Sequence, residues 1–80
     1  MKIPRDISGD ELAKKLKRFG YDVTRKTGSH MRLTTCECGE HHITIPQHKA
    51  LRIGTLAEIL VDIASHFKID RETLQKQLFK

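Results

Sequence analysis

The sequence predicts an α+β domain in which a three-stranded antiparallel sheet carries helices on one face. Three observations predict it: helical apolar spacing near both ends of the chain, alternating apolar and polar residues in the middle, and turn residues between the alternating runs. A chain of 80 residues has the size of one domain with a small core, so residues 1–80 are expected to form a single unit. The expected order is helix, three strands, helix and a short C-terminal helix.

The first helix is expected to run from Ser8 to Arg18 or Phe19, with Gly20 as its stop. It opens with Ser8-Gly9-Asp10-Glu11, a capping box in which the Ser8 and Glu11 side chains each satisfy a free backbone amide. Its apolar stripe faces the core, and its opposite face is a basic ridge available for phosphate contacts. The stripe is Leu12, Leu16 and Phe19, and the ridge is Lys14, Lys17 and Arg18.

The next two alternating runs predict a β-hairpin. Residues 21–26 read as a half-buried strand, Thr27-Gly28 supplies the turn, and residues 31–35 alternate again. In the second run the pleat sends Met31 and Leu33 to the core. The opposite face then carries His30, Arg32 and Thr34.

A third strand is expected over residues 41–45, ended by Pro46, which has no amide hydrogen for a sheet. If the turn keeps register, His42 and Thr44 share the outward face with His30. After a linker over residues 47–53, a second capping box, Thr55 to Glu58, is expected to open the longest helix. The stripe of this helix is Leu56, Ile59, Leu60, Ile63 and Phe67, and Asp70 is expected to cap a last helix from Arg71 to Leu78.

The positive charge is concentrated in the N-terminal part of the chain. The formal net charge is +5, and residues 1–35 hold all of that excess, since positive and negative residues balance in residues 36–80. A local cationic field attracts polyanions, so nucleic acid is the first expected partner class and an acidic protein the second. No stretch has the length of a membrane span and residues 1–6 lack the apolar run of a signal peptide, so a cytoplasmic protein is expected.

His30 is the candidate catalytic residue. An imidazole can move a proton at cellular pH, and the neighbouring Arg32 guanidinium can hold phosphate oxygens. Cleavage of a nucleic acid at a phosphate requires a base for the attacking hydroxyl and an acid for the leaving oxygen. The candidates for a second proton carrier are His42 and His48. The residues expected to contact the nucleic acid are Lys14, Lys17, Arg18, Arg25, Lys26, Ser29 and Arg32.

A metal site is a competing interpretation of the segment from Cys36 to His42. Cys36, Cys38, His41 and His42 are four of the seven cysteines and histidines in the chain. Zinc sites usually separate paired cysteines by two to four residues, and adjacent residues of a strand point to opposite faces. The spacing therefore favours an exposed turn with reduced thiols over a structural zinc site.

Taken in order, several of these pieces resemble the HicA toxin family, small ribonucleases of toxin–antitoxin pairs. The pieces are the short first helix, the Gly-Ser-His turn, an apolar strand ending in Pro-x-His, and a Gly-Thr-Leu helix start followed by an Ile-Leu pair; they are residues 8–19, 28–30, 43–48, 54–56 and 59–60. The resemblance spans about residues 8–78. It implies a fold like a double-stranded-RNA-binding domain, cleavage of mRNA with His30 as the catalytic histidine and no cofactor, and neutralisation by a HicB-type antitoxin. Two alternatives stay open: a non-catalytic RNA-binding module of the same fold, and a small zinc-stabilised interaction domain.

Overall fold

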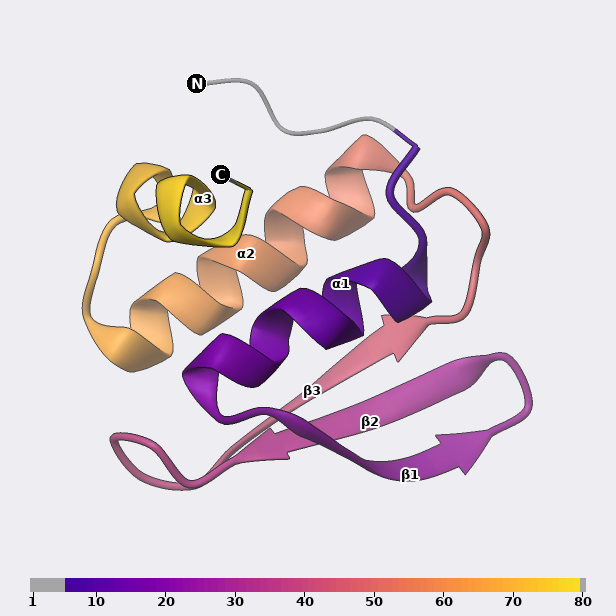
Figure 1. The fold of residues 1–80 in the computed structure, drawn as a ribbon, viewed down its shortest axis with the longest axis horizontal. Coiled ribbons are helices and arrows are strands. Elements are labelled where there is room, and N and C mark those ends of the chain that lie inside the picture. Colours follow the sequence, from indigo (N-terminus) through magenta and orange to yellow (C-terminus); the bar gives the residue numbers. More distant parts are fainter. Residues whose placement is uncertain (1–5, 80) are drawn as a thin grey trace.

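A computed structural model describes residues 6–79 as a three-stranded sheet with all helices on one side (Figure 1). Residues 1–5, which entered the expectation about a signal peptide, lie outside the described part. The elements are α1 (Gly9–Leu16), a 3-10 turn η1 (Lys17–Phe19), β1 (Asp22–Thr27), β2 (His30–Thr35), β3 (His41–Pro46), α2 (Ile53–Phe67) and α3 (Arg71–Leu78). None of the described helices is long and apolar enough to cross a bilayer.

The three strands are antiparallel in the order β1-β2-β3, as the sequence predicts. The helix α1 covers the sheet beside α2, and α3 packs against α2 (Figure 1). This arrangement, α-β-β-β-α with one added helix, is that of a double-stranded-RNA-binding domain. The predicted fold class is therefore confirmed.

The alternation in β2 and β3 sets which face of the sheet is buried. Met31, Leu33 and Thr35 of β2 are buried, whereas His30 and Arg32 are exposed. The register places Ile45 opposite Met31 and Ile43 opposite Leu33, so one apolar surface meets the helices. The α2 stripe completes the core with Leu56, Ile59, Leu60 and Ile63, while Phe67 packs against it half-buried.

The expected half-burial of the first strand is wrong. Tyr21 is fully buried, but every residue of β1 is exposed. β1 is an edge strand of the sheet, and a bulge between Val23 and Arg25 interrupts its pairing with β2. Bulges and charged side chains are common on edge strands, because they discourage pairing with other chains.

Two helix starts are as expected and one differs. The Ser8–Glu11 capping box is present, and the Asp70 side chain accepts a hydrogen bond from the Thr73 amide at 2.7 Å. The expected capping box at Thr55 is wrong, because α2 begins one turn earlier at Ile53, without a side-chain cap. The segment before α2 is anchored instead by buried Leu51, whose amide donates to the Ile7 carbonyl at 2.8 Å.

Gly9 holds the start of α1 against the end of β3. Its amide donates to the His48 carbonyl at 3.0 Å, and a Cβ atom here would collide with the Pro46 carbonyl oxygen. Gly54 occupies the first turn of α2, and an added Cβ there would meet no atom within 4 Å. Gly9 and Gly54 can therefore be compared directly, because an added methyl group would collide with the backbone at Gly9 and would meet no atom at Gly54.

We predict that Gly9→Ala lowers the free energy of unfolding by about 1–3 kcal/mol, the usual cost of forcing a group into a packed site. Gly54→Ala is expected to raise it by about 0.5–1 kcal/mol, because alanine favours the helix. Urea unfolding followed by circular dichroism measures both changes. Equal effects of the two substitutions would show that the contact at Gly9 does not matter.

Candidate active site

His30 is the first residue of β2 and follows the hairpin turn. Gly28 in that turn has a φ of 55°, a conformation that glycine adopts without strain. The Gln47 amide donates to the Ser29 carbonyl at 2.6 Å and ties the turn to the end of β3. The His30 side chain is exposed and has no hydrogen-bond partner within residues 6–79. Its two ring nitrogens are therefore free for a substrate.

The bulge in β1 brings Arg25 to the same face as His30. Strict alternation from buried Tyr21 would turn Arg25 toward the helices. The bulge at Thr24 shifts the pleat, so that Arg25 lies opposite Arg32. Both arginines then line the open face of the sheet, which is the face that α1, α2 and α3 do not cover. The sequence pattern gave no signal for the bulge, although Arg25 itself is among the expected RNA-binding residues.

Arg25 and Arg32 lack a carboxylate partner among the described residues, whose ion pairs are His41–Asp62, His42–Glu40 and Lys76–Glu72. Like charges directly opposite one another destabilise a sheet. The two arginines jointly line two shallow hollows of the open face. The first, of about 220 Å³, also contains Thr27, His30 and Thr44. The second, of about 440 Å³, also contains Thr24, Thr34, Glu40 and His42.

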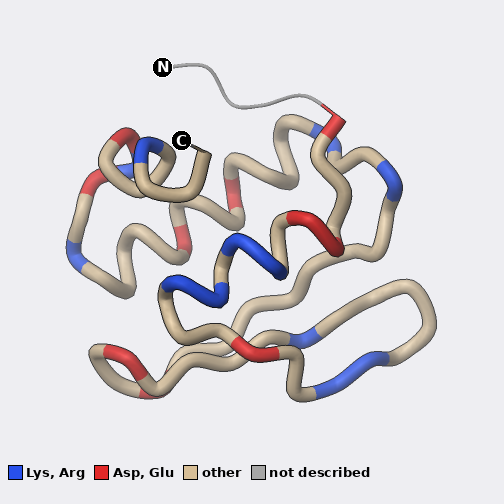
Figure 2. Tube along the Cα trace, in the orientation of Figure 1, with Lys and Arg blue, Asp and Glu red and all other residues tan. Residues whose placement is uncertain are grey.

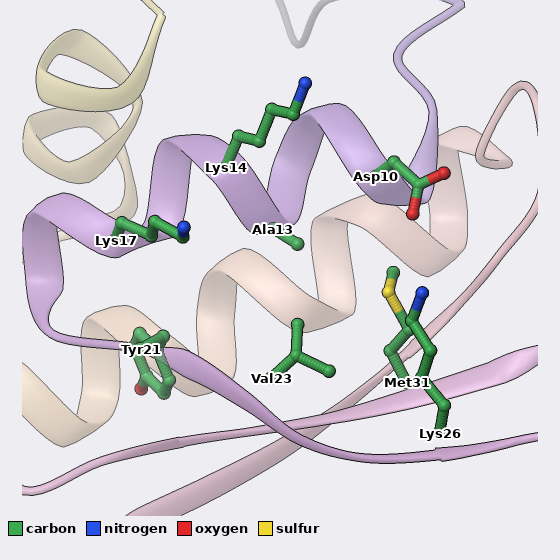
Figure 3. Close-up of a pocket in the computed structure, with 8 residues that line it drawn as sticks. All are labelled: Asp10, Ala13, Lys14, Lys17, Tyr21, Val23, Lys26 and Met31. Atoms are coloured by element: carbon green, nitrogen blue, oxygen red, sulfur yellow. The ribbon is translucent and has the colours of Figure 1, made fainter.

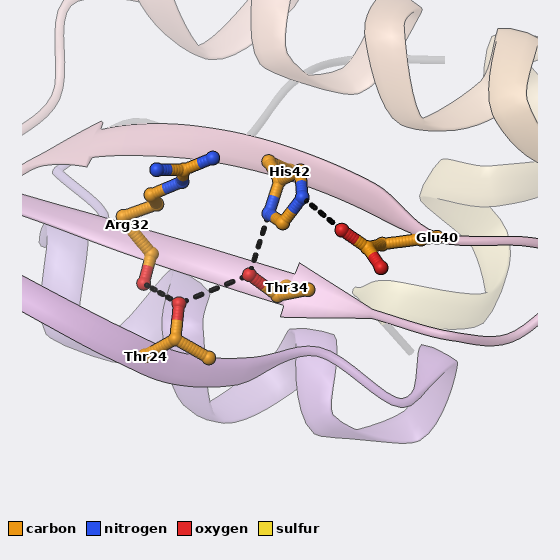
Figure 4. Close-up of polar contacts among 5 residues, drawn as sticks. All are labelled: Thr24, Arg32, Thr34, Glu40 and His42. Carbon is orange, nitrogen blue, oxygen red and sulfur yellow. Dashed lines mark hydrogen bonds and ion pairs between the residues drawn. The ribbon is translucent and has the colours of Figure 1, made fainter.

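A chain of hydrogen bonds crosses the second hollow (Figure 4). His42 Nε2 lies 2.7 Å from the Glu40 carboxylate, and its Nδ1 lies 2.7 Å from the Thr34 hydroxyl. The Thr34 and Thr24 hydroxyls are 3.0 Å apart, and Thr24 donates to the Arg32 carbonyl at 3.3 Å. A neutral imidazole and two hydroxyls hold three hydrogens for these four contacts, so the chain is complete when His42 carries a hydrogen on both nitrogens.

The expected second proton carriers differ in their position relative to His30. His42 pairs with Thr34, four residues along β2 from His30, which is about 13 Å at the rise of a strand. His42 and His30 therefore do not reach one phosphate together. His48 is exposed and directly follows Gln47, whose amide is bonded to Ser29. The structure thus brings the segment of His48, and not that of His42, beside His30.

The expected basic ridge is divided between two places. Lys14 and Lys17 line a groove of about 380 Å³ between α1 and the hairpin, together with Lys26. Figure 3 shows Lys26 and Met31 rising from the hairpin toward α1. Lys26 therefore lies on the helix side of the hairpin and does not share the open face with Arg25. Arg18 leaves the ridge altogether, because its guanidinium donates to the Gln77 carbonyl at 2.8 Å.

His41 and His42 are separated by the sheet. His41 turns to the helix side, where its Nδ1 lies 2.6 Å from the buried Tyr21 hydroxyl and its Nε2 lies 3.2 Å from Asp62. Burial raises the pKa of the Tyr21 hydroxyl above its usual value, and the charge of Asp62 adds to this. The His41 ring also stacks on His66, with ring centroids 4.4 Å apart.

The zinc interpretation has no support in this geometry. Residues 6–79 contain no group of three or more cysteine, histidine or acidic side chains that can hold a metal ion. Cys36 and Cys38 are free, exposed thiols at the turn before β3. This geometry agrees with the exposed turn with reduced thiols that the sequence favoured over a structural zinc site.

Charge is distributed unevenly around the fold, as Figure 2 shows. Lysine and arginine gather on α1 and on the β1–β2 hairpin, while the charged residues of α2 are the acids Glu58 and Asp62. The described part of the chain is thus a small domain with a double-stranded-RNA-binding-domain fold, a basic side, and a histidine without a hydrogen-bond partner beside two arginines.

The family model described as HicA toxin of bacterial toxin-antitoxin matches residues 9–64, from the first residue of α1 to the last turns of α2. The match covers more than half of the chain, and the protein belongs to the HicA toxin family. The resemblance seen in the sequence is thereby confirmed. No curated protein and no solved structure matches the chain. Membership makes the protein the toxin of a toxin–antitoxin pair, with an antitoxin as its partner.

We predict that Arg25→Gln and Arg32→Gln each stabilise the fold by several tenths of a kcal/mol at low salt, because each removes one of two like charges that lie opposite each other in the register. The gain should shrink in 1 M salt, where screening acts within about 3 Å. Urea unfolding at both salt concentrations measures it, with Lys49→Gln, at an exposed loop residue, as the control. Destabilisation by either arginine substitution would contradict the interpretation that Arg25 and Arg32 repel each other and lack a carboxylate partner within residues 6–79.

Proposed function

We propose that the protein is an endoribonuclease toxin that cleaves mRNA on the open face of its sheet, with His30 as the catalytic acid or base and no requirement for a metal. The observation that carries this proposal is the free imidazole of His30 in one hollow with Arg25 and Arg32. Membership of the HicA toxin family supports the proposal, because cleavage of mRNA would stop protein synthesis and so account for toxicity. The activity belongs in the cytoplasm, where the mRNA is.

The reaction needs only proton transfer and charge stabilisation. A neutral His30 takes the proton of a ribose 2′-hydroxyl, and the resulting oxygen attacks the adjacent phosphorus. The bond from phosphorus to the 5′-oxygen breaks, which leaves a 2′,3′-cyclic phosphate and, after protonation, a free 5′-hydroxyl. Arg25 and Arg32 hold the non-bridging oxygens, where negative charge increases in the transition state. A positioned acid or base contributes about 10²–10⁴-fold to the rate.

The leaving oxygen requires a second proton donor, and His48 is the better of the two candidates. The hydrogen bond from the Gln47 amide to the Ser29 carbonyl keeps the segment of His48 at the same end of the sheet as His30. His42 is too far along the strand and is engaged at both ring nitrogens. If His30 also returns the proton, His48→Ala will lower the rate less than His30→Ala.

The remaining expected RNA contacts lie around the β1 edge. Lys14, Lys17 and Lys26 in the helix-side groove supply charge for phosphates beyond the cleavage site. Ser29 lies in the turn directly before His30 and is close enough in sequence to contact the same nucleotide. Arg18 is omitted from the RNA surface, since its guanidinium is bonded to α3.

The antitoxin is proposed to be of the HicB type and to act by covering the open face. An acidic surface would pair with Arg25 and Arg32 and exclude RNA directly, without a conformational change in the toxin. Charge complementarity would also speed the encounter of the two proteins.

We predict that His30→Ala abolishes RNA cleavage and leaves the unfolding free energy within about 0.5 kcal/mol of wild type, as expected for an exposed residue whose side chain makes no hydrogen bond within residues 6–79. Purified proteins incubated with mRNA, followed by gel electrophoresis and urea unfolding, test both parts. Glu58→Ala on α2 serves as the control and should cleave normally. Cleavage by His30→Ala at the wild-type rate would refute the catalytic assignment, and RNA binding by a wild type that never cleaves would favour the non-catalytic RNA-binding module.

Occlusion makes a separate prediction about the antitoxin. When antitoxin is titrated into RNA bound to His30→Ala protein, it should displace the RNA, because both occupy the open face. Fluorescence anisotropy of labelled RNA follows the displacement. A ternary complex that retains full RNA affinity would instead indicate inhibition at a remote surface.

A further inference from the structure

We infer that the second hollow of the open face is a ribose-phosphate subsite for single-stranded RNA, occupied by the nucleotides next to the one cleaved at His30. The inference rests on the proposed function and extends it to the conformation and the sugar of the substrate. The hollow is lined by Thr24, Arg25, Arg32, Thr34, Glu40 and His42.

The spacing of side chains along β2 fits an extended strand of RNA. His30, Arg32 and Thr34 stand on the open face at every second residue, so each step is about 6.6 Å. Successive phosphates of an extended single strand are separated by a similar distance. A backbone that follows β2 therefore meets His30 first, then the arginine pair, and then the Thr34–His42 pair.

The arginine pair links the two hollows. Arg25 and Arg32 line both of them and have no carboxylate partner in the described part of the chain. An anion placed between the two guanidiniums removes the repulsion that the empty sheet carries. The pair therefore holds the scissile phosphate in the first hollow and the following phosphate in the second, so that a dinucleotide occupies the first hollow alone.

The rest of the second hollow is suited to a ribose. Thr34 and Thr24 contribute hydroxyls, and Glu40 is a carboxylate whose side chain is 67% exposed. One oxygen of that carboxylate lies 2.7 Å from His42 Nε2, which leaves the other oxygen to accept a hydrogen bond. The 2′-hydroxyl is the donor that RNA has and DNA lacks. No aromatic ring other than the His42 imidazole lines the hollow, so the subsite reads the backbone and not the base.

The His42–Thr34 hydrogen bond acts as a positioning contact. It fixes the imidazole between Glu40 and the strand, and the Thr24 hydroxyl extends the chain to the Arg32 carbonyl. Four side chains are therefore held in place before any ligand arrives. Such preorganisation reduces the entropy lost on binding.

The test measures binding of short oligonucleotides to His30→Ala protein, which is expected not to cleave them. The probes are a diuridylate, a tetrauridylate and the tetradeoxyuridylate, each followed by fluorescence anisotropy. Lengthening from the dinucleotide to the tetranucleotide should raise the affinity at least about tenfold, which is about 1.4 kcal/mol. The tetranucleotide should also bind better as RNA than as DNA.

Adding His42→Ala or Thr34→Val to His30→Ala should remove most of the gain from lengthening and most of the preference for RNA, and should leave the dinucleotide affinity unchanged. Glu40→Gln should reduce the preference for RNA while keeping the phosphate contacts. Thr55→Val on α2 is the matched control and should change nothing. His42→Gln, which keeps a hydrogen-bonding side chain, is used if His42→Ala fails to fold.

The subsite is refuted if the His42 and Thr34 variants bind the tetranucleotide as the parent does, or if they lose affinity for both lengths equally. The proposed function fails separately, by absence of cleavage in the wild-type protein. A wild type that cleaves, together with unaffected His42 and Thr34 variants, would therefore reject only the subsite.

Discussion

Burial of one face of the sheet under α1 and α2 is the constraint on which the rest of the structure depends. Met31 and Leu33 enter the core, so His30 and Arg32 must leave it. A slip of one residue in the register would exchange the two sets and bury a guanidinium, which makes the register strongly specified. The same constraint fixes β3, because Ile43 and Ile45 pair with the buried residues of β2. Within residues 6–79, His30 and Arg32 are therefore positioned by the core behind them, and not by hydrogen bonds of their own side chains.

The open face holds features that a sheet selected for stability alone would avoid. Among residues 6–79, Arg25 and Arg32 oppose each other without a counter-ion, and a bulge is what brings Arg25 there. In a domain this small, a few tenths of a kcal/mol is a noticeable fraction of the net stability. A substrate phosphate or an acidic antitoxin would supply the missing charge. Both proposed ligands would neutralise the same two arginines, and they are therefore expected to compete.

The sequence predicted the fold well because its main signals are local. Capping at Ser8 and Asp70, the alternation in residues 30–35 and the stripe of α2 each depend on neighbours within a few positions. Three features depended on distant contacts and were missed or misplaced: the start of α2 at Ile53, the exposure of β1, and the bulge at Thr24. The bulge alone explains why Arg25 joins His30 while Lys26 lies in the helix-side groove. The hydroxyls of Thr24 and Thr27 gave no sequence signal, since threonine is an ordinary strand residue, whereas the strand alternation had already placed Thr44 on the outward face with His30.

The central claim is that RNA lies on the open face of the sheet, along β2 from His30. The most direct measurement is an NMR titration of isotopically labelled His30→Ala protein with a short single-stranded RNA, in which every backbone amide reports on its surroundings. The account predicts the largest shifts at the outward residues of β2 and their partners in β1 and β3, with α2 and α3 nearly unchanged. Shifts confined to α2 and α3, with β2 unaffected, would contradict it.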